Sequence, residues 1–302
     1  MSYALVTGGC GFIGSNFVRY LIENTGLHPV ILDKLTYSGN LDNLDFITKN
    51  NYTFINGDIC NQELVQKLFT KYEFVGLFHF AAESHVDRSI DGPKEFIRTN
   101  IFGTFNLLQC SLNYYKKVKN NFRFIHISTD EVYGDLDETG YFKESTPYNP
   151  SSPYSASKAS SDHLVKSWGK TYGLPVLITN CSNNYGPYQF PEKLIPLMII
   201  NCLDWKDLPI YGDGKNVRDW LHVLDHCSAI ENVFENGLIN ETYNIGGNTE
   251  VRNIDIVHII CDFLDKNRPS NKGSYRQLIK FVEDRPGHDF RYAIDSSKIE
   301  ST

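Results

Sequence analysis

Long apolar runs, a basic excess and paired cysteines are all missing from this sequence of 302 residues. No stretch approaches the roughly 18 apolar residues of a membrane span, and no basic segment precedes the first apolar run, so we predict neither a membrane helix nor a signal peptide. The 29 Lys and Arg residues against 36 Asp and Glu argue against nucleic acid as a partner, because neutralising phosphates needs a basic face. The seven cysteines are scattered without a Cys-x-x-Cys pair, which indicates reduced thiols and a cytoplasmic protein.

The first 180 residues alternate between short apolar runs and longer amphipathic segments. Strands are predicted at 3–7, 30–33, 52–56, 76–80, 122–128 and 176–180. Helices are predicted at 15–23, 62–69, 94–113 and 155–172. This alternation predicts an α/β fold, a Rossmann-type doubly wound parallel sheet. Turn signals become frequent after residue 181, so we expect an NAD-binding domain at 1–180 and a smaller C-terminal α/β substrate domain at 181–302.

Small or polar residues stand at the carboxyl ends of the predicted strands. They are Gly8, Asp33, Asp58, Ala81, Ser128 and Asn180. Because ligands bind outside the carboxyl ends of open parallel sheets, these six positions predict one continuous site.

A glycine-rich turn connects the first predicted strand to the first predicted helix. Gly8, Gly11 and Gly14 form G-x-x-G-x-x-G, whose missing Cβ atoms let a pyrophosphate approach the backbone and the helix N-terminus. Asp33 follows about 20 residues later, at the end of the next strand, where a carboxylate suits the ribose hydroxyls of NAD and repels the extra phosphate of NADP. The motif predicts NAD binding; the alternative is an ordinary turn with a capping aspartate.

Tyr154 and Lys158 lie one helical turn apart, on one face of the predicted helix. The ammonium is expected to lower the pKa of the phenol, so that a tyrosinate takes a proton from a substrate hydroxyl. Ser128 and Thr129, at an earlier strand end, complete a Ser/Thr–Tyr–Lys set.

Eight motifs together carry a resemblance that extends over the whole chain. They are TGGCGFIG (7–14), AAESHVDRS (81–89), STDEVYG (128–134), YSASK (154–158), CSNNYGP (181–187), PEKLIP (191–196), GDGKNVRDW (212–220) and DRPGHD (284–289). The sequence resembles the extended short-chain dehydrogenase/reductases and, among them, the dTDP-glucose 4,6-dehydratases. The resemblance implies a lyase with NAD as cofactor, which converts a nucleotide sugar to its 4-keto-6-deoxy product in deoxysugar biosynthesis. It also implies a homodimer formed through the helices at 94–113 and 155–172.

The adjacent carboxyls of Asp130 and Glu131 suit this chemistry. Oxidation at sugar C4 acidifies the C5 hydrogen, which a base must remove while an acid protonates the leaving C6 hydroxyl. Two neighbouring carboxyls divide these roles because each raises the pKa of the other. By family analogy Asp130 is the acid and Glu131 the base; the alternative is an acidic cap of a following helix.

The resemblance implies further roles, residue by residue. The catalytic set is Thr129, Asp130, Glu131, Tyr154 and Lys158. The cofactor set is Gly8, Gly11, Phe12, Ile13, Gly14, Asp33, Asp58, Ile59, Ala81, Ala82, Thr99, Tyr154, Lys158 and Asn184. The substrate set is Ser84, Thr129, Asn183, Lys193, Leu194, Pro209, Tyr211, Arg218, Asn253, Arg285 and His288.

The sequence leaves several alternative activities open, and it departs from similar sequences in two places. A UDP-glucose 4,6-dehydratase, a nucleotide-sugar 4-epimerase or a non-catalytic NAD-sensing protein would share the same scaffold. Asn180 stands where similar sequences have arginine, and they continue beyond Thr302 into a tryptophan-bearing segment and a last helix, which suggests a shortened C-terminus. His222 and His226 have helical metal-ligand spacing, but no third ligand is evident, so we predict no metal site.

Overall fold

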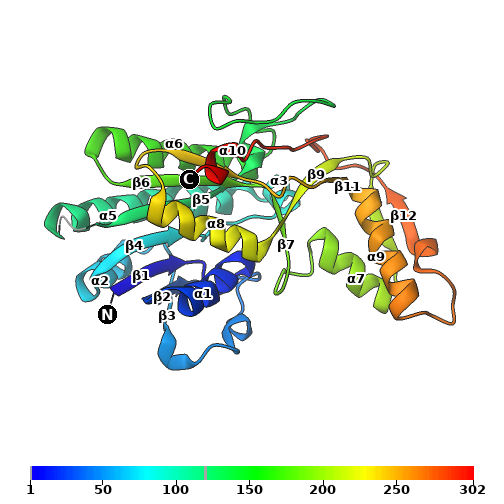
Figure 1. The fold of residues 1–302 in the computed structure, drawn as a ribbon, viewed down its shortest axis with the longest axis horizontal. Coiled ribbons are helices and arrows are strands. Elements are labelled where there is room, and N and C mark those ends of the chain that lie inside the picture. The colour runs from blue at the N-terminus through cyan, green and yellow to red at the C-terminus, as the bar shows by residue number, and fades with distance from the viewer. Residues whose placement is uncertain (1, 119–120) are drawn as a thin grey trace.

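A parallel sheet of seven strands forms the larger part of the molecule (Figure 1). The structure is a computed structural model that describes residues 2–118 and 121–302. The strand order is β3-β2-β1-β4-β5-β6-β10, and every neighbouring pair is parallel. The strands are β1 (Ser2–Thr7), β2 (Leu27–Asp33), β3 (Thr53–Asn56), β4 (Phe74–His79), β5 (Arg123–Thr129), β6 (Val176–Cys181) and β10 (Thr242–Ile245). This order confirms the predicted doubly wound fold.

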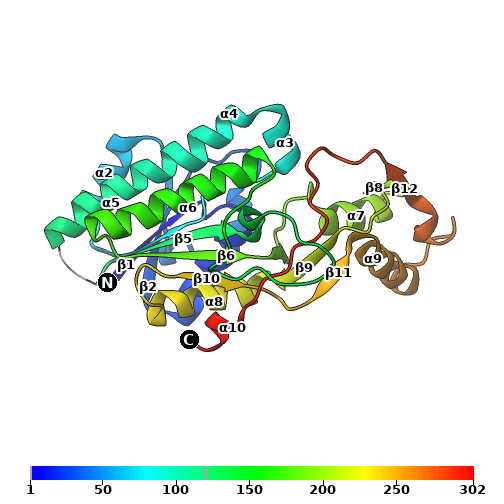
Figure 2. The same cartoon turned by 90° about the horizontal axis from the view of Figure 1, so that it is seen from above.

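Helices cover both faces of this sheet (Figure 2). One face carries α1 (Phe12–Asn24) and α8 (Val223–Asn236). The other carries α2 (Gln62–Lys71), α5 (Thr104–Val118) and α6 (Pro153–Tyr172). Because successive side chains of a strand point to opposite faces, a strand supplies both cores, and the apolar run from Ala4 to Val6 in β1 is buried on each side.

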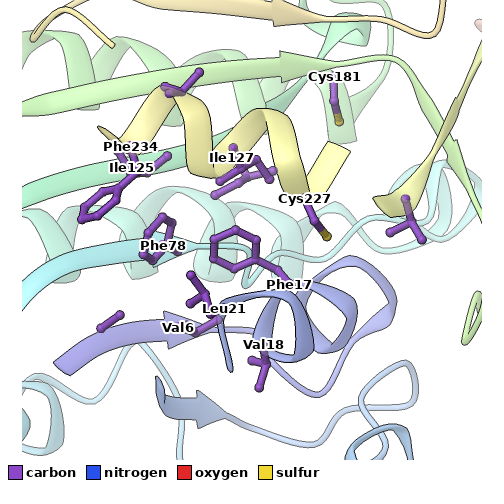
Figure 3. Close-up of a cluster of buried hydrophobic side chains, with 14 of the residues drawn as sticks. Val6, Phe17, Val18, Leu21, Phe78, Ile125, Ile127, Cys181, Cys227 and Phe234 are labelled. Carbon is purple, nitrogen blue, oxygen red and sulfur yellow. The ribbon is translucent and has the colours of Figure 1, made fainter. Parts of the chain in front are cut away.

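The two cores are separate clusters of apolar side chains. Val6 of β1 packs with Phe17 of α1 and Phe234 of α8 in the cluster of Figure 3. Its neighbour Leu5 packs into the opposite cluster with Leu107 of α5. The sheet is therefore held from both sides, and its strand ends are fixed relative to one another.

The predicted helix at 94–113 is divided into three segments. It comprises α4 (Pro93–Phe96), a π-helical stretch (Ile97–Gly103) and α5. A π-helical stretch often marks a functional position, and here it contains Thr99 and Asn100, whose contacts are described below. Helix α3 (Val86–Asp91) precedes it.

A smaller lobe lies beyond the carboxyl ends of the strands (Figures 1 and 2). Its helices are α7 (Leu194–Leu203) and α9 (Asn253–Asn267). Three of its strands form one sheet: β7 (Asn183–Tyr185), β9 (Val217–His222) and β11 (Glu250–Arg252). The other two, β8 (Leu208–Tyr211) and β12 (Ile279–Val282), form a separate pair. The short helix α10 (Ser297–Glu300) contacts β10.

Two elements that follow residue 180 in the chain belong to the larger lobe. Helix α8 and strand β10 lie after that residue, yet they belong to the core and the sheet of the first lobe. Within the described residues, no helix is long and apolar enough to cross a membrane.

Candidate active site

A pocket opens beyond the carboxyl ends of the neighbouring strands β1 and β4, where the strand order reverses. The glycine turn forms its base: Gly8, Gly11, Phe12, Ile13 and Gly14 all line it. Gly8 has φ +74°, and a Cβ there would come within 2.7 Å of the Ala81 nitrogen. The turn thus lies directly against the end of β4, and the free N–H groups of the first turn of α1 face a cradle suited to a pyrophosphate.

Asp33 is fixed at the pocket wall by backbone donors. Its Oδ2 accepts a hydrogen bond from the Cys10 N–H at 2.9 Å, and its Oδ1 accepts one from the Leu35 N–H at 2.8 Å. Burial raises the pKa of Asp33, an effect that these N–H donors oppose. Two oxygens held at the end of β2 offer acceptors to the hydroxyls of a ribose, which is the position that the sequence predicted for NAD.

The remaining residues of the predicted cofactor set also line this pocket. They are Asp58, Ile59, Ala81, Ala82, Thr99, Tyr154, Lys158 and Asn184. Asp58 lies 3.2 Å from the Lys34 ammonium. Although burial alone would raise the pKa of Asp58, the Cys60 N–H and Lys34 together hold it below its ordinary value. The donors, the acceptors and the glycine cradle therefore fit a dinucleotide.

Helix α6 presents Tyr154 and Lys158 to the pocket. The helix begins at Pro153 behind a capping box of Ser152 and Ser155, which fixes the position of its first turn. Lys158 donates through Nζ to the Ile127 carbonyl oxygen at 2.8 Å, and both functional side chains are buried.

The electrostatics of this pair differ from the prediction in one respect. In the protein alone, the pKa of Tyr154 is raised, because burial and the nearby charge of Glu131 disfavour a phenolate. Burial also lowers the pKa of Lys158, while Asp162 opposes that change. The expectation of a lowered phenol pKa is therefore wrong for the chain without a ligand.

The three residues Thr129, Asp130 and Glu131 lie beside that pair. Strand β5 ends at Thr129, and a 3-10 helix (Asp130–Tyr133) begins there. The Thr129 hydroxyl accepts from the Glu131 N–H and donates to Asp130 Oδ1, both at 3.3 Å. The tight turn lets consecutive side chains face one pocket, which an extended strand would not allow.

The two carboxyls have different surroundings. Burial and the charge of Glu131 raise the pKa of Asp130 well above its ordinary value. Burial also raises the pKa of Glu131, but the cations Arg285, Lys193 and Arg218 oppose this rise. Asp130 is thus the carboxyl that more readily remains protonated, as a general acid must, and Glu131 is the more easily ionised.

The predicted substrate residues divide into two groups. Ser84, Thr129, Asn183 and Lys193 line the pocket. The others lie outside that lining, in the smaller lobe: Leu194, Pro209, Tyr211, Arg218, Asn253, Arg285 and His288.

Asp87 of α3 connects two members of this outer group. Its carboxylate lies 3.1 Å from Arg285 Nη1 and accepts a hydrogen bond from the Tyr211 hydroxyl at 3.2 Å. The Tyr211 ring in turn packs edge-on against His288. Leu194 follows Lys193 at the start of α7, whereas Pro209 lies in β8 and Asn253 begins α9.

Asn180 does not face the pocket, and its assignment to the continuous site is wrong. Its amide nitrogen donates to the hydroxyls of Tyr133 at 2.9 Å and Tyr148 at 3.2 Å, in the protein interior. The next residue, Cys181, lines the pocket instead, because neighbouring residues of a strand point to opposite sides. The other five strand-end residues, Gly8, Asp33, Asp58, Ala81 and Ser128, all line the pocket.

Sequence reasoning missed several lining residues. They are Leu32, Lys34, Thr36, Ser38, Gly39, Gly57, Phe80, Glu83, Ile127, Cys181, Ser182, Gln189, Phe190 and Glu192. Many of them lie in loops after strand ends or inside the quoted motifs, which is the signal that could have found them.

Asn100, in the π-helical stretch, holds one of these loops. Its side chain accepts from the Glu83 N–H at 2.9 Å and donates to the Glu83 carbonyl at 3.0 Å and to Ser157 Oγ at 2.8 Å. It thereby joins the loop after β4 to helix α6.

The two histidines with metal-ligand spacing serve other purposes. His222 caps α8 by accepting from the Leu224 N–H, and His226 is hydrogen-bonded to the Asn184 side chain at 2.9 Å. Among the described residues, no group of three or more His, Cys, Asp or Glu side chains is arranged to hold a metal ion.

Known structures resemble this fold. The dTDP-glucose 4,6-dehydratase of Bacillus anthracis in complex with NAD superposes with a TM-score of 0.88 at 46% identity, covering 100% of this chain and 90% of that one. The NAD-bound dTDP-glucose 4,6-dehydratase of Streptomyces venezuelae has a TM-score of 0.90 at 45% identity, covering 99% of this chain and 90% of that one. The UDP-glucose 4-epimerase of Thermotoga maritima has a TM-score of 0.88, over 99% and 91%, but only 29% identity. The scaffold alone therefore does not separate these activities.

Sequence comparison does separate them. The dTDP-glucose 4,6-dehydratase of Salmonella typhimurium is 56% identical over 98% of this chain and 85% of its own length. The dTDP-glucose 4,6-dehydratase 1 of Escherichia coli K12 has the same identity and coverage. The sequence model of the family described as GDP-mannose 4,6 dehydratase matches residues 5–302. The chain therefore belongs to the nucleotide-sugar 4,6-dehydratase family, among the dTDP-glucose 4,6-dehydratases.

Proposed function

We propose that this protein catalyses the NAD-dependent dehydration of dTDP-glucose to dTDP-4-keto-6-deoxyglucose and water. The observation that carries the proposal is the pair of carboxyls, the buried Asp130 and the partly buried Glu131, which line one pocket with Tyr154 and Lys158. An epimerase only oxidises and reduces C4 and needs no acid–base pair at C5 and C6. The identity of 56% to dTDP-glucose 4,6-dehydratases supports the same substrate.

The residues of this chain divide the reaction among them. When bound in the glycine cradle, NAD supplies an acceptor for the C4 hydride and later returns that hydride to C6. Tyr154 takes the proton of the C4 hydroxyl, and Lys158 and Thr129 hold the phenol and the sugar in place. Once C4 is a ketone, Glu131 removes the C5 proton and Asp130 protonates the C6 oxygen, which leaves as water. Glu131 then returns its proton to C5.

The cations around Glu131 point to an anionic substrate. Lys193, Arg218 and Arg285 come from separate segments of the smaller lobe, and each interacts with the Glu131 charge. Arginine and lysine are suited to the pyrophosphate of a nucleotide sugar. We propose that this group lies between the lobes and that residues 181–302 supply most of the nucleotide-sugar contacts.

The experiment that tests the function is a panel of nucleotide sugars. The protein is incubated separately with dTDP-glucose, UDP-glucose and GDP-mannose, and the products are identified by mass. The proposal predicts loss of one water from dTDP-glucose. A product of unchanged mass with inverted C4 would establish the epimerase instead, and faster dehydration of UDP-glucose would reassign the nucleotide.

We also propose a homodimer in the cytoplasm. Support for the dimer comes from apolar side chains on the outer face of the helices at 94–113, where Ile97, Phe102 and Phe105 are exposed. Support for the compartment comes from seven cysteines that are all free thiols. The ketone product is suited to later steps that build deoxysugars.

A further inference from the structure

One turnover leaves the active site in a different protonation state from the one in which it began. This reasoning rests on the function proposed above. Tyr154 gains the proton of the C4 hydroxyl, whereas Asp130 loses a proton to the departing water. Glu131 takes a proton from C5 and returns it there, so its state does not change. After each turnover, therefore, the proton that Asp130 needs is held by Tyr154.

The side chain of Thr129 lines the same pocket as these two residues. The Thr129 hydroxyl donates a hydrogen bond to Asp130 Oδ1 at 3.3 Å. The phenol of Tyr154 lines the same pocket, near enough to this hydroxyl for Thr129 to act on the pKa of the phenol. The exposed fractions of Tyr154, Thr129 and Asp130 are 8%, 7% and 2%, so the path between them is screened from bulk water.

The two carboxyl oxygens of Asp130 differ in their hydrogen-bond partners. Oδ1 accepts from Thr129, whereas the buried Oδ2 has no hydrogen-bond partner within the described part of the chain. An unpaired buried oxygen beside the pocket is available to a substrate hydroxyl. Asp130 can thus face the sugar with one oxygen while the other remains hydrogen-bonded to Thr129.

We propose that Thr129 is a proton relay that resets the site after each turnover. The Tyr154 O–H bond breaks as the Thr129 oxygen accepts that proton, and the original Thr129 O–H bond breaks as its proton passes to Oδ1 of Asp130. Thr129 ends as it began. The negative charge moves from the Asp130 carboxylate to the Tyr154 oxygen, and no proton is taken from solvent.

The surroundings of Asp130 reduce the difference in proton affinity that this transfer must overcome. A carboxylate ordinarily holds a proton far more weakly than a phenolate. Burial, the charge of Glu131 and that of Asp219 all raise the pKa of Asp130. Burial and these charges therefore favour the protonated acid that the reset must restore, whereas an exposed aspartate would remain ionised.

The test compares the first turnover with the later ones. Thr129→Val removes the hydroxyl and keeps the shape of the side chain. Rapid-quench assays with excess dTDP-glucose measure product per site by mass. Loss of the positioning hydroxyl slows every turnover, whereas loss of the reset affects only the turnovers after the first. We therefore expect a burst of about one product per site, and the ratio of first-turnover to steady-state rate should rise at least tenfold over wild type. Thr129→Ser retains the hydroxyl and should keep the wild-type ratio.

Two controls separate the relay from other causes. The rate of product dissociation, measured by displacing the product with excess dTDP, should be the same in Thr129→Val as in wild type. Thr129→Ala also lacks the hydroxyl and should show the same burst. It therefore tests the relay even if the valine variant does not fold.

An unchanged ratio in the variants without the hydroxyl, whatever their overall rate, overturns the relay. So does slow product dissociation that accounts for the steady-state rate. A wild-type protein that forms no dehydrated product refutes the proposed function itself.

Discussion

Three glycine-to-alanine variants separate the folding of the dinucleotide cradle from its binding. A Cβ at Gly14 would lie 2.1 Å from the Gly8 carbonyl oxygen and 3.0 Å from the Gly9 Cα, which are backbone atoms that cannot turn aside. A Cβ at Gly11 would meet only the Gly8 oxygen, at an ordinary 3.4 Å, but it would stand in the pocket. Gly26 has nothing within 4 Å and is the matched control.

The expected magnitudes follow from these distances. Overpacking against fixed atoms costs about 1–3 kcal/mol, and the Gly14 contact is severe, so we expect the upper end of that range. For a large domain this lowers Tm by roughly 6–10 °C. Gly11→Ala should change stability by less than about 1 kcal/mol, but its methyl group would displace the pyrophosphate and weaken NAD binding by on the order of 10- to 100-fold.

The assay is thermal unfolding with and without NAD, together with calorimetric titration of NAD into stripped protein. Gly14→Ala should lose both stability and affinity, Gly11→Ala affinity alone, and Gly26→Ala neither. If Gly11→Ala binds NAD as tightly as wild type, the pyrophosphate does not lie over this turn. If Gly14→Ala has the same Tm as the Gly26→Ala control, the contact with Gly8 does not limit packing.

Four further outcomes are expected. Asp33→Ala should bring the affinities for NADP and NAD closer together in calorimetry, and a wild-type protein that binds both equally would contradict the role of this carboxylate. Tyr154→Phe should lower kcat by on the order of 10²–10⁴, as for a lost general base; more than a tenth of the wild-type rate would assign the base elsewhere. Glu131→Gln should still reduce bound NAD, seen as absorbance in a single turnover, but should not exchange the C5 hydrogen in D₂O, and exchange at the wild-type rate would exclude Glu131 as the base. Asp130→Asn should stabilise the ligand-free protein more at pH 8 than at pH 5. Because the pKa of Asp130 is raised in the folded state, its contribution to stability is full below the pKa of the unfolded state and is lost as pH rises through the pKa of the folded state. A Tm difference that does not grow with pH would show that the folded protein tolerates the charge.

Much of the cofactor half of the site could be predicted from the sequence, because its signals are local. Gly8 and Asp33 each follow directly on a strand, and the positions of the strands come from the apolar pattern. Since the carboxyl ends of parallel strands meet at one edge of the sheet, predicting the strands also predicted that these residues would come together. The tyrosine and lysine of α6 are one helical turn apart, so their common face was equally a local property.

The tertiary structure alone decided which charges meet at Glu131 and which strand-end residues turn inward. Arg218 and Arg285 are distant from Glu131 in the sequence, and only the packing of the smaller lobe brings their charges to bear on it. Asn180 was assigned to the site from its place at a strand end, but the direction of its side chain depends on partners in other segments, Tyr133 and Tyr148.

The direction of the Tyr154 pKa has the same origin. The spacing to Lys158 is written in the sequence and predicts a lowered value. Burial and the charge of Glu131 raise it instead, and both depend on the folded chain as a whole. Sequence periodicity determines which side chains share a strand or helix face, whereas desolvation and long-range charge act through space and are fixed only when the lobes are packed.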